Sequence, residues 1–238
     1  MKKSIFPFIV FYFFIHTLSI NAQSVKLGVR GGINIANLSF DPEISTILPG
    51  MSNSNRTVFL VGGILQLDLA GPVSLVVEPT YIQKGVNVEG NNILFEIEGQ
   101  QYQLNNLKVS YKLEYLEIPV LLKVNIPLPM VKPYAEVGPT IGLNLSSSFT
   151  TDITYAGQDM SEDTDNKDNT SSTEFGLAFG AGVEYSISPL VSFVIDGRYS
   201  LGLSDLSKDQ ANADQQQGQN PKIKSSGIQF TLGVLFGL

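Results

Sequence analysis

Cysteine is absent from the 238 residues, and basic residues are few. Without cysteine the chain has no disulfide framework, no cysteine-ligated zinc site and no lipid-modified cysteine at its mature N-terminus. The formal net charge is −7, and the lysines and arginines form no basic stripe. We therefore expect no nucleic-acid partner, because binding to phosphates requires such a stripe.

Histidine occurs once, at His16, inside an apolar run that follows Met1-Lys2-Lys3 and ends shortly before Ala22. A charged start, an apolar run and a small residue are typical of a secretory signal peptide. An uncleaved anchor is the alternative, but the run is short for a membrane span and a proline interrupts it. We predict a signal peptide over residues 1–22 and one domain over residues 23–238. The mature chain then lacks the histidine and cysteine on which nucleophilic catalysis usually depends.

Residues 115–124, YLEIPVLLKV, indicate a β-strand with two different faces. Leucine, isoleucine and valine fill every even position, whereas Glu117 and Lys123 have the opposite parity. Successive side chains of a strand point to opposite sides, so one face is apolar and the other is charged. No helix is predicted elsewhere that could cover the apolar face. Lipid is the alternative cover, and a strand covered by lipid belongs to a transmembrane β-barrel.

The same alternation recurs along the mature chain and predicts eight strands. Long polar connections, expected as loops over about 36–55, 88–106, 150–172 and 207–222, follow the odd-numbered strands, and short turns follow the even-numbered ones. This pattern is typical of bacterial outer-membrane barrels. The predicted fold class is all-β, an eight-stranded antiparallel up-and-down transmembrane β-barrel over residues 23–238. Its strands have their first apolar positions near Val25, Phe59, Val73, Leu116, Ala135, Phe175, Val191 and Ile228.

Charged side chains gather on the inward parity of these strands. A barrel of eight strands is only wide enough for side chains to fill its interior. The charges could form a catalytic or proton-relay cluster, but a structural ion network is favoured, because charges inside a closed barrel must be paired. The predicted lumen network comprises Lys26, Arg30, Glu78, Glu117, Lys123, Glu136, Glu184, Asp196 and Arg198.

Two further motifs have plain structural interpretations. The glycine runs at 28–32 and 180–182 are followed by no helix, so they indicate lumen spacers or strand bends rather than phosphate-binding loops. The acidic segment from Asp152 to Asp168 suggests calcium, but it lacks the glycine and the distal glutamate of a calcium loop. A solvated surface loop is favoured there, and we expect neither a metal site nor a cofactor.

Six sequence runs carry a resemblance to a known family: GVRGGINIANLS, VEPTYIQKG, YLEIPVLLK, KPYAEVGP, FGLAFGAGVEY and IDGRYSLGL. In this order they resemble the PorT-type outer-membrane β-barrel family of Gram-negative bacteria, and they span nearly all of the mature chain. YLEIP followed by the KPY strand is the most specific part. The resemblance implies the fold and an outer-membrane location. The family's named member takes part in secretion and maturation, and that role is assigned to no residue here.

Three functional hypotheses follow. The first is a non-enzymatic integral outer-membrane barrel whose surface loops serve interaction or adhesion, or make the protein a subunit of an envelope assembly. The family resemblance connects such an assembly with secretion. The second is an outer-membrane enzyme acting on lipid or peptide at the barrel rim. A soluble ligand carrier is the third, but it needs an apolar interior. We expect three partners: outer-membrane lipid, the barrel-assembly machinery during insertion and an envelope protein.

Overall fold

The computed structural model describes residues 24–41, 51–97, 100–155, 158–208 and 222–238, and the predicted signal peptide lies outside them. Almost all of these described residues are in β-strands. The described residues contain no helix that is long enough and apolar enough to cross a membrane. The elements are β1 (Ser24–Asp41), β2 (Met51–Asp68), β3 (Val73–Val77), β4 (Thr80–Ile97), β5 (Gln100–Asn125), β6 (Val131–Tyr155), β7 (Gln158–Asp165), the 3₁₀ helix η1 (Lys167–Asn169), β8 (Thr173–Ser188), β9 (Val191–Gly202) and β10 (Lys222–Gly237).

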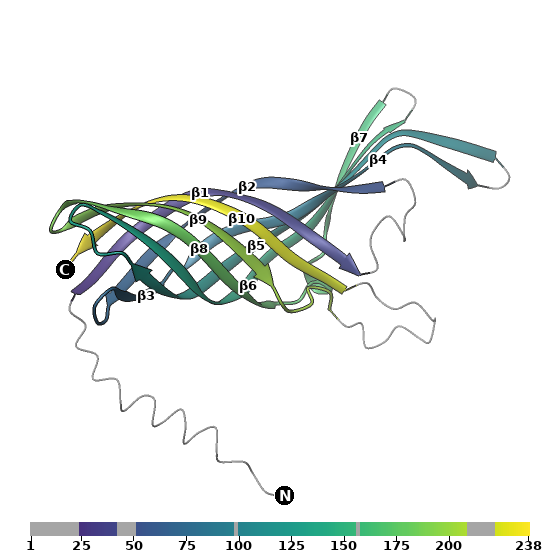
Figure 1. Cartoon of the computed structure of the whole chain (residues 1–238). Helices are drawn as coiled ribbons and strands as arrows, with labels where there is room; N and C mark the ends of the chain where they lie inside the picture. The colour runs from purple at the N-terminus through teal and green to yellow at the C-terminus, as the bar shows by residue number, and fades with distance from the viewer. Residues whose placement is uncertain (1–23, 42–50, 98–99, 156–157, 209–221) are drawn as a thin grey trace, which may run out of the picture.

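The strands close into one antiparallel ring with eight positions (Figure 1). β1 pairs with both β2 and β10, so the first and last strands seal the barrel. β3 and β4 both lie between β2 and β5 and together fill the third position. β7 pairs with β6 beyond the ring. The predicted eight-stranded up-and-down barrel is confirmed.

The third position is divided because of Pro79, which has no backbone N–H to donate to a neighbouring strand. The wall stays joined on both sides of the break. The Gly63 N–H donates to the Pro79 carbonyl at 3.0 Å, and the Glu78 N–H donates to the Pro119 carbonyl at 3.2 Å. Glu78 thereby remains in the wall with its side chain inside the barrel, where it is 3% exposed.

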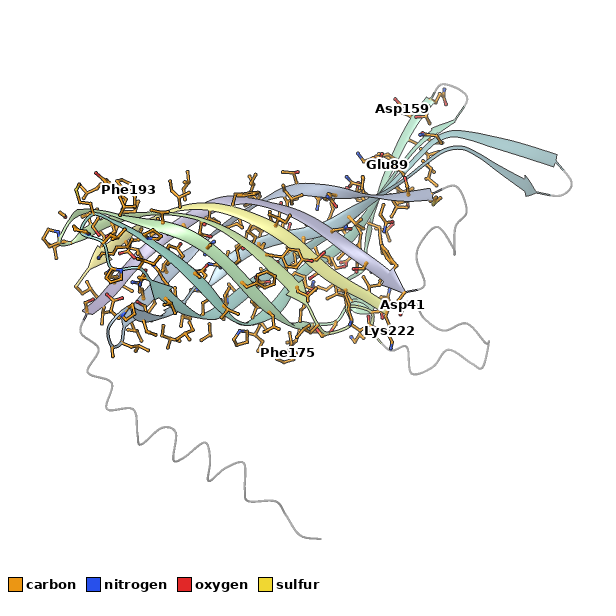
Figure 2. The ribbon with its side chains drawn as sticks, viewed as in Figure 1. Asp41, Glu89, Asp159, Phe175, Phe193 and Lys222 are labelled. Carbon is orange, nitrogen blue, oxygen red and sulfur yellow. The ribbon has the colours of Figure 1, made fainter. Side chains whose placement is uncertain are left out.

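The two faces of the wall differ as the alternation predicts. In β5, Leu122 points outward and is 46% exposed, whereas its neighbour Lys123 points inward and is 2% exposed. Large apolar side chains are exposed on the outer faces of β1, β2, β5, β6, β8, β9 and β10, and Figure 2 shows Phe175 and Phe193 directed away from the barrel. Within the described part of the chain, no protein layer lies over this apolar outer surface. Only hydrocarbon covers such a surface without an unfavourable exposure to water.

The two ends of the barrel are unlike each other (Figure 1). One end has the short connections 69–72, 126–130 and 189–190, of which the first turns at Gly71 with φ of 61°. The chain's C-terminus lies at the same end. At the opposite end, β4 with β5 and β6 with β7 extend as two hairpins beyond the ring. We call their joined four-stranded surface, β4–β5–β6–β7, the projecting sheet.

The predicted loops are shorter than expected, because strand pairing continues into them. The segment 88–106 was expected as a loop, but it forms the end of β4 and the start of β5. The segment 150–172 contains the end of β6, all of β7 and η1. Backbone hydrogen bonds between antiparallel strands need no apolar face, so pairing persists where the lipid-facing pattern ends. The alternating apolar residues at 93, 95 and 97 were a sequence signal for strand in this segment.

Candidate functional site: the barrel interior and the projecting sheet

The interior of the barrel holds charged side chains in three successive groups. The first group lies near the short connections. Lys26 Nζ is 2.8 Å from Glu184 Oε1 and 3.5 Å from Asp68 Oδ2, and Lys123 Nζ is 2.8 Å from Glu184 Oε2. Lys123 Nζ also lies 4.1 Å from the centre of the Tyr134 ring, which adds a cation–π contact. Two lysines and two carboxylates therefore balance each other here.

The second group fills the middle of the barrel around two arginines. Arg198 Nη1 is 2.7 Å from Glu78 Oε2, and its Nη2 is 2.5 Å from Glu136 Oε1. Arg30 contacts the same Glu78 carboxylate and is 3.3 Å from Asp196 Oδ1. All five side chains are buried. Since an unpaired buried charge is strongly unfavourable, removal of one arginine leaves its carboxylate partners in a costly state.

The third group is centred on Lys84, whose Nζ is 2.6 Å from Glu117 Oε2 and 2.9 Å from Glu174 Oε2. Glu174 also accepts a hydrogen bond from the Ser225 hydroxyl. Sequence reasoning placed Glu117 here but missed Lys84 and Glu174. Both have the inward parity of their strands, so the same alternation was available to find them. They were missed because each borders a segment that was expected to be a loop.

Apolar side chains also enter the interior, which the sequence analysis did not predict. One buried cluster lies between the third charged group and the long connections, and it includes Leu206 from the segment after β9. A second cluster lies between the charged groups nearer the short connections. Apolar side chains fill a narrow barrel without needing partners, so they pack where no counter-charge is available. The first cluster comprises Leu38, Leu60, Ile82, Val86, Val88, Tyr111, Leu113, Tyr115 and Leu206.

All nine residues of the predicted lumen network lie inside the barrel with their charged ends in ion pairs. Every carboxylate among them is within 4 Å of a lysine or arginine nitrogen, which holds it in place as a counter-ion. Among the described residues, no group of three or more His, Cys, Asp or Glu side chains is arranged to hold a metal ion.

The acidic segment after residue 150 forms the outer hairpin of the projecting sheet, and Asp159 lies near its tip (Figure 2). Three carboxylates on one face are each held by a hydroxyl on the facing strand. Asp159 accepts from Thr154 at 2.8 Å, Asp152 accepts from Ser161 at 2.6 Å, and Asp163 accepts from Thr150. The Thr150 hydroxyl and the Lys112 ammonium lower the pKa of Asp163. The carboxylates are thus spread along a flat ladder rather than gathered around one point, as calcium would require.

The family comparison agrees with this geometry. Residues 21–208 match the family described as the outer membrane protein beta-barrel domain. None of the curated proteins matches the sequence. Among solved structures, the chain is similar to Neisserial surface protein A, with 14% identity, a TM-score of 0.43 and coverage of 88% of this chain and 96% of that one.

Two other solved structures have a similar degree of likeness. The attachment invasion locus protein Ail of Yersinia pestis is 15% identical, with a TM-score of 0.39 and coverage of 89% and 98%. The outer membrane protein OprG of Pseudomonas aeruginosa is 13% identical, with a TM-score of 0.46 and coverage of 90% and 95%. From the closed ring, its apolar outer surface and the family match, we conclude that the chain belongs to the outer membrane protein beta-barrel domain family and is located in the outer membrane.

Proposed function

We propose that this protein is a non-enzymatic outer-membrane barrel that binds a partner protein of the envelope or the cell surroundings through its projecting sheet. The observation that carries the proposal is the contrast between the two candidate sites. The interior is filled by ion pairs and apolar clusters, whereas the projecting sheet exposes backbone, carboxylates and apolar side chains together. A PorT-type role as a subunit of an envelope assembly is one form of this function, and the sequence motifs support it.

The interior supports this proposal because it leaves little room for solute transport. The arginines of the middle group and the lysine of the third group extend across the lumen to carboxylates on distant strands. The apolar cluster with Leu113 and Leu206 then lies between these charges and the long connections. Water and ions would have to separate paired charges and cross this cluster, so the barrel serves as an anchor for what lies outside it.

The projecting sheet has two chemically different faces. On one face stands the carboxylate and hydroxyl ladder of the β6–β7 hairpin, continued on β5 by Lys108, which is 3.5 Å from Glu89. On the other face Ile153 lies opposite Met160, which is 54% exposed. Near the barrel this second face is fixed by the stacked rings of Tyr111 and Phe149, whose centres are 4.4 Å apart. A face with charges and a face with apolar side chains are both available to a partner.

The free edge of β7 determines how a partner would attach. β7 pairs with β6 on one side, and no backbone hydrogen bond joins its other side to the described chain. An extended segment could add there as a further strand, which is a common mode of peptide recognition. β7 contains four carboxylates and no lysine or arginine, and all eight of its residues are exposed. A second copy of β7 would be repelled, so we expect a partner segment rich in lysine or arginine.

A photocrosslinking experiment in cells tests the proposal. A photoreactive amino acid replaces Glu162 on β7, and a control replaces Leu190, which is exposed at the short connections. We expect the Glu162 position to give a discrete adduct with another protein that the Leu190 position does not give. Neutralising β7 with Asp159→Asn, Asp163→Asn and Asp165→Asn should abolish the adduct, because the cationic segment is no longer attracted.

Two results would contradict the proposal. One is equal crosslinking from both positions, or from neither, in cells in which the variants fold and reach the outer membrane. The other is a hydrolytic activity on lipid or peptide that copurifies with the folded barrel and persists after the β6–β7 hairpin is removed. That second result would favour an enzyme at the barrel rim.

A further inference from the structure

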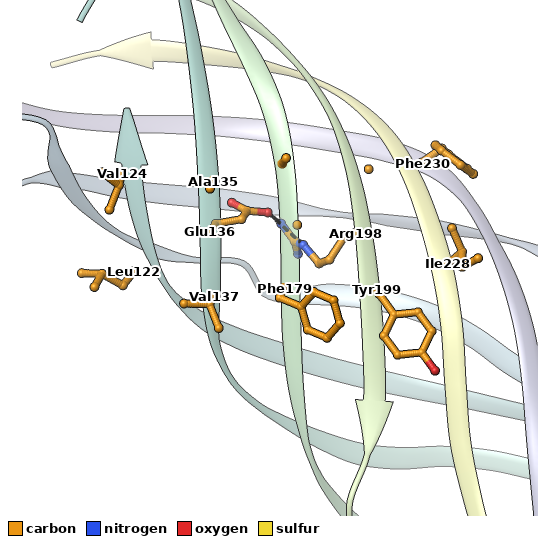
Figure 3. Close-up of a pocket in the computed structure, with 13 residues that line it drawn as sticks. Leu122, Val124, Ala135, Glu136, Val137, Phe179, Arg198, Tyr199, Ile228 and Phe230 are labelled. Carbon is orange, nitrogen blue, oxygen red and sulfur yellow. Dashed lines mark hydrogen bonds and ion pairs between the residues drawn. The ribbon is translucent and has the colours of Figure 1, made fainter. Parts of the chain in front are cut away.

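A groove crosses the outer wall of the barrel over β5, β6, β8, β9 and β10, with a volume of about 720 Å³ (Figure 3). Its floor consists of the three smallest outward side chains of adjacent strands. Ala135 pairs with Ala181, and Ala181 pairs with Gly197, so the three lie in one row across the sheet. Neighbouring strands are about 4.8 Å apart, so this row extends for about 10 Å.

Large side chains stand along one side of the floor and at both ends. The next cross-strand row contains Val137, Phe179 and Tyr199, and the Phe179 and Tyr199 rings are 5.4 Å apart at an angle of 43°. Figure 3 shows Val124 near one end of the floor and Phe230 near the other. The aromatic pair gives the groove a firm wall, since each ring limits the rotation of the other.

The small residue at position 197, which gives the groove its depth, is not required by close contact with a neighbouring backbone. A methyl group added at Gly197 would lie 3.6 Å from the Phe230 ring, which is an ordinary contact. The inward Gly180 beside it is different, because an added methyl group would come within 2.7 Å of the Gly197 carbonyl oxygen. The wall therefore requires glycine at position 180 but not at position 197. Alanine would fit at position 197, and the absence of its methyl group leaves the groove open.

We propose that this groove binds one hydrocarbon chain of an outer-membrane lipid. It lies in the apolar outer surface, which faces hydrocarbon in the outer membrane. Glu136 and Arg198 border it from behind, but their charged ends meet each other inside the barrel at 2.5 Å (Figure 3). A lipid chain, which is flexible and has no polar group, matches this lining and makes dispersion contacts along the whole row.

A second copy of the barrel fits the groove less well. Two barrels related by a twofold axis through this face would set one concave row against the other and leave an empty space between them. Such a space would forfeit the contacts that stabilise an interface. The hydrocarbon chain fills it instead, so the proposal commits to lipid.

Fluorescence quenching tests the proposal, because the chain has no tryptophan of its own. Phe179→Trp places the sole emitter on the groove wall, and Phe59→Trp places it elsewhere on the outer face. The two positions are matched, with exposures of 51% and 50% and a tyrosine ring at 5.4 Å and 5.6 Å. Folded protein in maltoside micelles is titrated with a brominated stearate. We expect half-quenching of the Phe179→Trp variant at a several-fold lower mole fraction of the quencher.

Filling the groove supplies the decisive comparison. Gly197→Leu should remove the difference between the two emitters, whereas Gly63→Leu, on the outer face where an added methyl group has 3.8 Å of space, should leave it. If Gly197→Leu does not fold, Ala181→Val fills the same row with a smaller change. Equal quenching of the two emitters, or a difference that survives the filled groove, overturns the proposal. So does sedimentation of the Phe179→Trp protein as a dimer whose emission resists the quencher.

Discussion

Arginine at Leu232 would place a cation in the middle of the apolar outer surface. Leu232 is 64% exposed and lies at the centre of the outward run of β10, in register with Gly31 and Ile195 on the adjoining strands. Arginine near the midplane of the bilayer costs about 2–4 kcal/mol in a transmembrane barrel. Because about 1.4 kcal/mol corresponds to a factor of ten, the folding equilibrium of Leu232→Arg should fall about 30- to 700-fold.

Leu128→Arg is the matched control. Leu128 is also an exposed leucine, at 48%, but it lies in the short connection 126–130 at one end of the barrel. Near the membrane surface the cost is about 0–1 kcal/mol. The assay is refolding from urea into lipid vesicles, with the folded fraction measured from faster migration on unboiled gels. Equal folding of the two variants would refute the lipid-facing assignment, because both positions would then face water.

Three further predictions concern the interior and the loop end. Arg198→Met should lower the free energy of unfolding in urea by about 3–5 kcal/mol, because two buried carboxylates lose their partner. Lys108→Met, at an exposed ion pair, should cost only about 0–1 kcal/mol. Similar losses in the two variants would mean that water fills the interior. Planar bilayers containing the protein should show little steady conductance, and a large stable channel would contradict the filled lumen. Burial raises the pKa of Asp205, but hydrogen bonds from the Ile223 N–H and from Ser207 outweigh it and leave that pKa lowered. Its stabilising contribution is therefore present above about pH 4, the ordinary value for aspartate, and is lost as the pH falls through the lowered pKa. Hydrogen exchange at the Ile223 amide should show this loss of protection, whereas Asp205→Asn, which cannot titrate, should give a flat profile; identical profiles would rule out the link.

The alternation of apolar and polar residues determined most of the fold. Leu122 and Lys123 are neighbours in sequence, and their opposite parity alone predicted that one faces lipid and the other the lumen. This works because a strand has two faces and a transmembrane barrel has two very different surroundings. The pattern fails where both faces meet water. The hairpins from 88 to 106 and from 150 to 165 were therefore expected as loops, although they are paired strands.

The tertiary structure alone decided which inward residues meet. Lys84 and Glu174 are 90 positions apart in the sequence, and their contact depends on how each strand is staggered against the next around the ring. The row of Ala135, Ala181 and Gly197 also depends on this stagger. Nothing in the sequence of any one strand indicates a groove, which forms only because the register places the three small residues side by side. Parity is a property of one strand and can be read from its sequence. Register is a property of all eight strands together, because closing the barrel fixes every stagger at once.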